Sequence, residues 1–243
     1  MESTSILCYY IIDFLNTIIL MKVGCLMGKK AFIYPIQLNI TDKPCTIIGG
    51  GKVALRKVEN LLAAGALITL IAPEPIPELL ALAKIGKITF LQRKFEPGDT
   101  KGAFLVFAAT NNSAVNALVA QEANRNKQLL NVIDEPDLGN FTVPGSWQNG
   151  NLIFTVTTGG TPALTKLITR ELSTSYGDCF ADFAEFLLEV RANIKNIPST
   201  SQEREKLWQE MLTPNIIHLV RTGNIKKAKE SITNAINSFR PQS

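Results

Sequence analysis

The sequence predicts an α/β fold in which a doubly wound parallel sheet is followed by a small strand-and-helix segment and a helical C-terminal region. Two observations lead to this expectation. From Phe32 onward, short β-branched runs alternate with amphipathic helical patterns, which is the order of elements in βαβ units. The short runs are apolar on both faces, as parallel strands are when helices cover both sides of a sheet.

The elements of the first half follow in chain order. The first helix ends on Gly65, a C-cap residue, and a helix started by proline covers 75–86. Asn111 or Asn112 is expected to cap the helix over 111–127. The expected strands are residues 45–49, 67–72, 88–93, 103–110 and 129–134, and the apolar stripe of the first helix is Val53, Val58, Leu61 and Leu62. This alternation predicts a Rossmann-like sheet.

Composition excludes several classes of protein. The chain has 243 residues, of which 46% are apolar and 19% charged, values typical of a globular protein. The net charge of +4 is spread along the chain, without the dense basic cluster that nucleic-acid binding needs. The four cysteines show no CxxC or CxxH spacing, so we expect no metal site and no disulfide framework, and a cytoplasmic location.

Residues 1–30 do not fit the pattern of the rest. Their apolar run from Ile6 to Leu20 is interrupted by Asp13 and Asn16, and no Lys or Arg precedes it. A signal peptide needs such a positive region, and a membrane span needs about 20 apolar residues. We interpret residues 1–30 as a dispensable extension; a weak membrane anchor is the alternative.

The stretch "CTIIGGGKVALRKVENLLAAG" carries the clearest motif. Gly49, Gly51 and Ala54 fit G-x-G-x-x-A between a strand and a helix, the pattern that holds a dinucleotide pyrophosphate at a helix N-terminus. The cofactor-binding residues expected from this motif and from the end of the second strand are Gly49, Gly50, Gly51, Lys52, Val53, Ala72, Pro73 and Glu74.

The end of the second strand predicts which dinucleotide binds. In domains that bind NAD, an acidic residue at this place usually contacts the ribose. In domains that bind NADP, an arginine there contacts the 2′-phosphate. Here the strand ends at Ala72 and Pro73, the nearest carboxylate is Glu74, and no arginine is present. We therefore expect NAD, with Glu74 as its ribose contact.

Catalytic and substrate-binding residues are expected at the carboxyl ends of the strands. Three segments end there, residues 108–112, 131–141 and 155–166. Asp134 closes its strand and would face the nicotinamide; the alternative is that it only shapes the turn before Pro136. The single histidine, His218, falls in a C-terminal helix, which disfavours a dehydrogenase that depends on histidine.

Four segments together resemble the precorrin-2 dehydrogenase family, which includes the N-terminal modules of siroheme synthases. They are "YPIQLNITDKPCTIIGGGKVALRKVENLLAAGALITLIAPE", "FAATNNSAVN", "NVIDEPDLGNFTVP" and "VTTGGTPAL". The resemblance implies that NAD oxidises precorrin-2 to sirohydrochlorin, and some members also insert ferrous iron as sirohydrochlorin ferrochelatases. It also implies a Rossmann domain, a dimerising segment and a helical C-terminal region.

The resemblance also assigns residues. The catalytic aspartate of the family, its general base, falls on Asp134. The chain departs from the family where Asn111 and Asn112 replace acids, and where Lys166 replaces an arginine. Thr158, Gly159 and Lys166 are the expected contacts to the tetrapyrrole carboxylates, although Lys166 could equally be a surface charge. The glycine loop of the family corresponds to Gly49, Gly50, Gly51, Val53, Ala54, Arg56 and Lys57. Its "AATxD" turn corresponds to Ala109 and Thr110, which the resemblance adds to the expected cofactor-binding residues.

The domain boundaries follow from these assignments. We expect the NAD-binding domain at 31–143, a dimerisation segment at 144–175 and a helical domain at 176–243. The apolar strand 151–158 has no partner sheet after the connector "PGSWQNG", so pairing across a two-fold axis is expected, giving a homodimer. The C-terminal helices carry one apolar stripe, Phe180, Phe183, Leu187, Val190 and Ile194. The alternative function is a regulatory NAD-binding module without catalysis.

Overall fold

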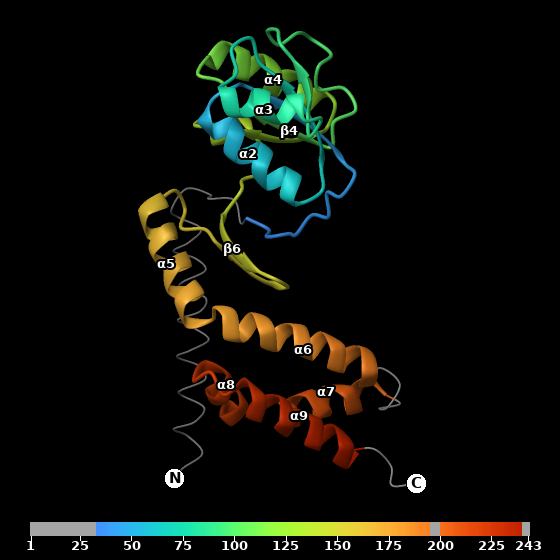
Figure 1. Cartoon of the computed structure of the whole chain (residues 1–243). Coiled ribbons are helices and arrows are strands. Elements are labelled where there is room, and N and C mark those ends of the chain that lie inside the picture. Colours follow the sequence, from blue (N-terminus) through green and yellow to red (C-terminus); the bar gives the residue numbers. More distant parts are fainter. Residues whose placement is uncertain (1–32, 195–199, 240–243) are drawn as a thin grey trace, which may run out of the picture. The chain divides into compact units, whose positions relative to one another are not determined.

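A computed structural model describes residues 33–194 and 200–239 of the chain. These residues form two compact units, called unit 1 and unit 2, which divide between Gln128 and Leu129 (Figure 1). The prediction for residues 1–30 lies outside the described residues. In the part that is described, none of the helices has the length and apolarity to cross a membrane.

A five-stranded sheet has the strand order β3-β2-β1-β4-β5. β1 pairs in parallel with β2 and β4, and β2 with β3, which confirms the predicted Rossmann-like class. The strands are β1 (Pro44–Ile48), β2 (Leu67–Ile71), β3 (Thr89–Leu91), β4 (Leu105–Ala108) and β5 (Leu129–Val132); the helices between them are α2 (Lys52–Ala63), α3 (Pro77–Lys84) and α4 (Ser113–Arg125). Asn112 caps α4 by accepting a hydrogen bond from the amide of Val115.

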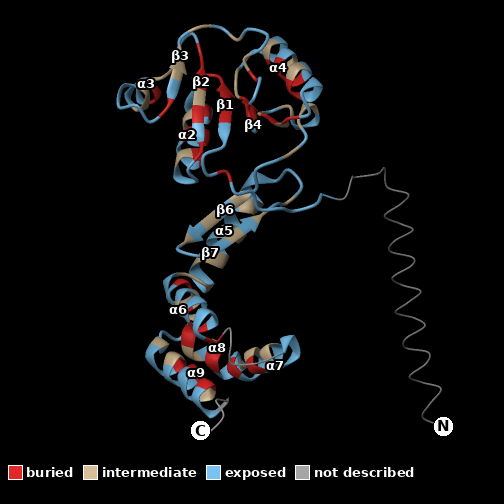
Figure 2. Ribbon diagram, turned by 90° about the vertical axis from the view of Figure 1, so that its right-hand side faces the viewer, coloured by how far each residue is buried: buried red, intermediate tan, exposed pale blue. Residues whose placement is uncertain are grey.

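The core of unit 1 lies on the central strands, which Figure 2 shows as buried. Ile47, Leu70 and Val106 have no exposed surface. α2 buries Ala54, Lys57, Val58 and Leu61 against the sheet. The predicted stripe was therefore wrong at Val53, which is 38% exposed, because the small Ala54 and the stem of Lys57 take the inward face.

Unit 2 begins with β5, which is followed by a short 3₁₀ turn η1 (Pro136–Leu138) and a hairpin of β6 (Gly145–Asn149) and β7 (Leu152–Val156). The two strands pair antiparallel, and Trp147 stacks on Phe154 with ring centroids 5.4 Å apart. The expectation of a lone strand after a connector was wrong, because "GSWQN" forms the partner strand. Its alternation of Ser146 and Gln148 with Trp147 is too short and polar to indicate a strand.

Five helices complete unit 2 in the described residues: α5 (Pro162–Ser175), α6 (Asp178–Ile194), α7 (Ser201–Met211), α8 (Pro214–Arg221) and α9 (Ile225–Phe239). The last four enclose a core that includes Phe183, Val190 and Ile194, with Phe180 and Leu187 packed against it. The predicted C-terminal stripe is thereby confirmed. His218 lies exposed on α8.

Candidate functional site

The glycine loop after β1 is shaped by two glycines that the fold itself requires. Gly49 has φ of 127°, a backbone conformation that side chains disfavour, and a Cβ there would collide with the carbonyl of Ala109. A Cβ on Gly50 would lie 2.7 Å from the Cα of Pro75 and 2.9 Å from the Cβ of Ala72. The loop thus packs directly against the ends of β2 and β4.

Gly51 differs from its two neighbours. Its φ is −93°, which other residues adopt readily, and among the described residues no atom lies within 4 Å of the place where its Cβ would stand. Gly51 is the N-cap of α2, offers no side chain to cap the helix, and no acidic residue stands in the first turn. Among the described residues, the amides of this turn thus have no capping side chain, an arrangement that fits the pyrophosphate of a dinucleotide.

The neighbouring strand ends lie close to this loop. Ala72 is buried, whereas Pro73 and Glu74 are exposed. The amide of Ala109 donates to the carbonyl of Ile48 at 2.7 Å. The Thr110 hydroxyl donates to Oδ1 of Asn116 at 2.8 Å, and Nδ2 of Asn116 donates back to the Thr110 carbonyl at 3.1 Å. All ten sequence-predicted cofactor positions are thus in unit 1, on the loop, the start of α2 and the ends of β2 and β4.

A lysine of α2 is buried next to an aromatic ring of β4. Lys57 is 9% exposed, and its Nζ sits 5.6 Å from the centroid of the Phe107 ring. Burial lowers the pKa of Lys57, and the charge of Arg56 lowers it further. The aromatic face stabilises the buried ammonium.

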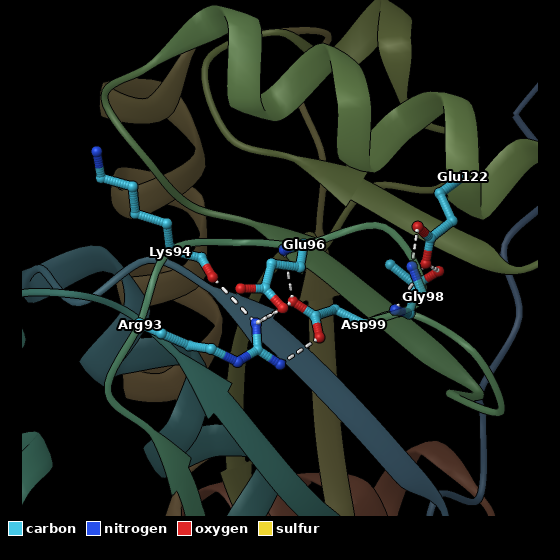
Figure 3. Close-up of polar contacts among 7 residues, drawn as sticks. Arg93, Lys94, Glu96, Gly98, Asp99 and Glu122 are labelled. Atoms are coloured by element: carbon cyan, nitrogen blue, oxygen red, sulfur yellow. Dashed lines mark hydrogen bonds and ion pairs between the residues drawn. The ribbon is translucent and has the colours of Figure 1, made fainter.

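The loop between β3 and β4 carries polar contacts that sequence reasoning missed (Figure 3). Arg93 makes a bidentate pair with Asp99, with Nη1–Oδ2 at 2.7 Å and Nη2–Oδ1 at 2.6 Å. Oδ2 of Asp99 also accepts from the amide of Glu96 at 2.8 Å. The hydrogen bond from Arg93 lowers the pKa of Asp99, more than burial raises it. No sequence pattern marks this pair, because its members lie in an irregular loop.

Glu122 of α4 holds the other end of this loop. Its carboxylate accepts from the amide of Gly98 at 2.7 Å and from the amide and hydroxyl of Thr100 at 2.8 and 2.5 Å. Burial raises the pKa of Glu122, but these hydrogen bonds outweigh burial and leave the pKa lowered. Gln128 adds two bonds, to the carbonyls of Thr100 and Ala103.

Asp134 lies in unit 2, two residues beyond β5. Its φ is 65°, a left-handed conformation that aspartate and asparagine tolerate better than most residues. The side chain is exposed, and no hydrogen bond or ion pair to it is found within 33–194 and 200–239. The carboxylate is therefore available to an incoming group.

The loop that carries Asp134 is tied back to its own strand. The amide of Leu130 donates to Oδ1 of Asn140 at 2.8 Å, and the amide of Asn140 donates to the Leu130 carbonyl at 2.9 Å. Nδ2 of Asn131 donates to the carbonyl of Phe141 at 3.0 Å. The hydrogen bonds of Asn131 and Asn140 thus hold the loop that contains Asp134 against β5.

The expected substrate contacts lie on the segment between β7 and α5. The Thr158 hydroxyl donates to the carbonyl of Thr161 at 2.8 Å and lies 2.7 Å from the hydroxyl of Thr165. Gly159 and Lys166 are exposed. The sequence-predicted residues therefore fall into two groups, one in each unit. Among the described residues, no group of three or more His, Cys, Asp or Glu side chains is arranged to hold a metal ion.

The sheet order, the glycine loop and the open start of α2 define unit 1 as a dinucleotide-binding Rossmann domain. Accordingly, residues 36–145 match a family described as putative NAD(P)-binding. A solved structure, "SirC, precorrin-2 dehydrogenase", superposes with a TM-score of 0.67 and 28% sequence identity, over 82% of this chain and 99% of that chain. The chain is therefore similar to a precorrin-2 dehydrogenase over most of its length.

Curated siroheme synthases are also similar to this chain. A siroheme synthase of Methylobacillus flagellatus is 34% identical over 204 residues, which are 84% of this chain and 44% of the relative. Siroheme synthase 1 of Aeromonas salmonicida is 37% identical over 180 residues, 74% of this chain and 38% of the relative. The chain thus spans less than half the length of the curated relatives it matches.

Proposed function

We propose that this protein dehydrogenates precorrin-2 to sirohydrochlorin, with NAD as the oxidant, in siroheme biosynthesis. The observation that carries the proposal is the likeness to the precorrin-2 dehydrogenase SirC, which extends over 99% of that chain. In this reaction the tetrapyrrole loses one hydride and one proton. The protein must therefore hold a hydride acceptor and supply a base.

The glycine loop would hold the cofactor. The amides at the start of α2 would bind the pyrophosphate beside Gly51, and Ala109 and Thr110 would line the neighbouring strand end. Glu74 is the proposed ribose contact, and NAD is preferred because no arginine directly follows β2. Bound NAD supplies the hydride acceptor.

Asp134 would take the proton. The strand order puts β5 next to β4, and we propose that Asp134, which follows β5, faces the nicotinamide. An exposed carboxylate on a loop whose two ends are held by hydrogen bonds can act as a general base. Thr158, Gly159 and Lys166 are the proposed contacts to the substrate carboxylates, and we propose the cytoplasm as the compartment.

We further propose that the protein is a homodimer built around residues 144–175. Within the described part of the chain, α5 buries none of its residues. Ile153 of β7 and Leu164 and Leu167 of α5 are 42%, 44% and 62% exposed. A helix and a hairpin that expose this much apolar surface require a partner, and a second copy across a two-fold axis would cover it.

The experiment is anaerobic incubation of the purified protein with precorrin-2 and NAD. We expect the absorption spectrum of sirohydrochlorin to appear together with one equivalent of NADH. Binding of NAD without either product would instead indicate a regulatory module. A second arm with ferrous iron decides whether the protein also acts as a sirohydrochlorin ferrochelatase.

A further inference from the structure

The end of β2 has a cationic neighbour that does not belong to β2. The carbonyl of Leu91, the last residue of β3, accepts from the amide of Ala72 at 3.2 Å and from the amide of Arg93 at 2.9 Å. One carbonyl thus links the backbone of Arg93 to Ala72, at the end of β2, where Rossmann folds bind the adenosine ribose. An arginine side chain is long enough to cross the spacing of two adjacent strands, about 4.8 Å.

The guanidinium of Arg93 is turned toward its own loop. Besides the two bonds to Asp99, Nη1 donates to the carbonyl of Lys94 at 3.0 Å and lies 3.8 Å from a carboxylate oxygen of Glu96. The Asp99 side chain is 10% exposed and that of Arg93 35%, so the aspartate is the fixed member of the pair. Figure 3 shows the Lys94 ammonium pointing away from this cluster.

We infer that the Arg93–Asp99 pair determines the choice between NAD and NADP. A ribose 2′-phosphate is bound by an arginine in NADP-specific Rossmann domains, and planar bidentate pairing is what arginine offers to phosphate. Asp99 occupies that bidentate face and adds a negative charge beside it. NAD carries a hydroxyl group at the ribose 2′ position and needs no cation there. The Arg93–Asp99 pair therefore disfavours the binding of NADP and not that of NAD. The inference rests on the proposed function, since it requires that unit 1 bind a nicotinamide dinucleotide.

Asp99→Asn removes the competing charge and leaves Arg93 free to turn. We expect the dissociation constant for NADP to fall by about tenfold, the effect of one charge-assisted hydrogen bond. The constant for NAD should stay within about twofold. The double variant Asp99→Asn with Arg93→Gln should lose the gain. Titration calorimetry of the full chain with each cofactor measures both constants, and the gain should shrink at high salt.

Glu122→Ala is the matched control, because it loosens the same loop without contacting Arg93. Equal tightening of NADP binding in this control would overturn the inference, as would a gain that persists in the double variant. If Asp99→Asn fails to fold, Asp99→Ser keeps an oxygen for the Glu96 amide and carries the same expectation. If the protein binds NAD but neither Asp99 variant changes the dissociation constant for NADP, this inference is refuted and the proposed function is not. If the wild-type protein binds neither NAD nor NADP, the proposed function fails together with this inference.

Discussion

In unit 1 the central strands β1, β2 and β4 are almost wholly buried, whereas in unit 2 the hairpin β6–β7 and α5 bury no residue among those described. Unit 1 encloses its own core and fixes its loops with buried or half-buried polar groups. Beyond β5, the buried core cluster of unit 2 in the described residues lies among α6 to α9. The glycine loop of unit 1 is thus packed against the ends of β2 and β4, whereas the hairpin and α5 leave apolar surface exposed, which is the basis of the proposed dimer.

Leu167→Glu tests whether that surface comes from a second copy. A buried leucine stabilises an interface by about 1.5–3 kcal/mol, and a two-fold axis uses it twice. The dimer dissociation constant should rise by about 10²-fold or more, with an unchanged melting temperature of the monomer. Sedimentation velocity across a concentration series measures the constant.

Leu118→Glu provides the control in unit 1. Leu118 lies on α4 and is 53% exposed, so the chemical change is the same outside the hairpin–α5 surface. It should leave the dimer intact. Dissociation by both variants, or by neither, would contradict the proposed interface.

Glu122→Ala probes how unit 1 fixes its loops. It leaves the buried Thr100 hydroxyl and amide and the Gly98 amide without their acceptor, and unsatisfied buried groups cost about 1–3 kcal/mol. We expect the free energy of unfolding, measured with urea, to fall by about 2 kcal/mol. An unchanged unfolding midpoint would mean that water replaces the carboxylate without cost.

The Glu122 contribution should also depend on pH. Because the folded protein lowers the pKa of Glu122 below its ordinary value of 4.5, the contribution is complete above that value. It is lost as pH falls through the lower pKa of the folded state. The difference between wild type and Glu122→Ala should therefore be constant near neutral pH and shrink below pH 4.5. A difference that grows on acidification would contradict this.

Gly51→Ala distinguishes a glycine needed by the ligand from those needed by the fold. Since an added Cβ meets no described atom and φ is ordinary, the melting temperature should change little. The methyl group would occupy the space proposed for the pyrophosphate, so NAD affinity should fall about tenfold. Unchanged NAD binding would place the pyrophosphate elsewhere.

The sequence was sufficient to predict the sheet, the capping of α4 by Asn111 or Asn112, of which Asn112 is the cap, and the packing of the C-terminal helices. Each follows from a local pattern: β-branched runs, N-cap chemistry or a helical apolar stripe. It failed at β6, where five residues with polar alternation gain strand structure only by pairing with β7. The sequence pattern also predicted wrongly that Val53 is buried. A lysine is ordinarily assigned to the surface, so the pattern did not indicate that Lys57 lies on the buried face of α2.

The candidate site was predictable to a different extent in each unit. The glycine loop has a spacing that backbone geometry demands, and the structure gives Gly49 and Gly50 a steric reason. The partners of the loop 93–100 could not be predicted, because Glu122 reaches it from 22 to 24 residues away. The left-handed backbone at Asp134 was likewise invisible, and it changes which substitution tests that residue best.

Asp134→Asn tests most directly whether this residue removes the proton. Asparagine keeps the shape and suits a φ of 65°, whereas alanine would strain the backbone by about 1–2 kcal/mol. In anaerobic single-turnover experiments with precorrin-2 and NAD, we expect the rate to fall by about 10²-fold or more. NAD affinity and melting temperature should be unchanged. Sirohydrochlorin formation at a rate near that of the wild type would show that Asp134 only shapes its turn.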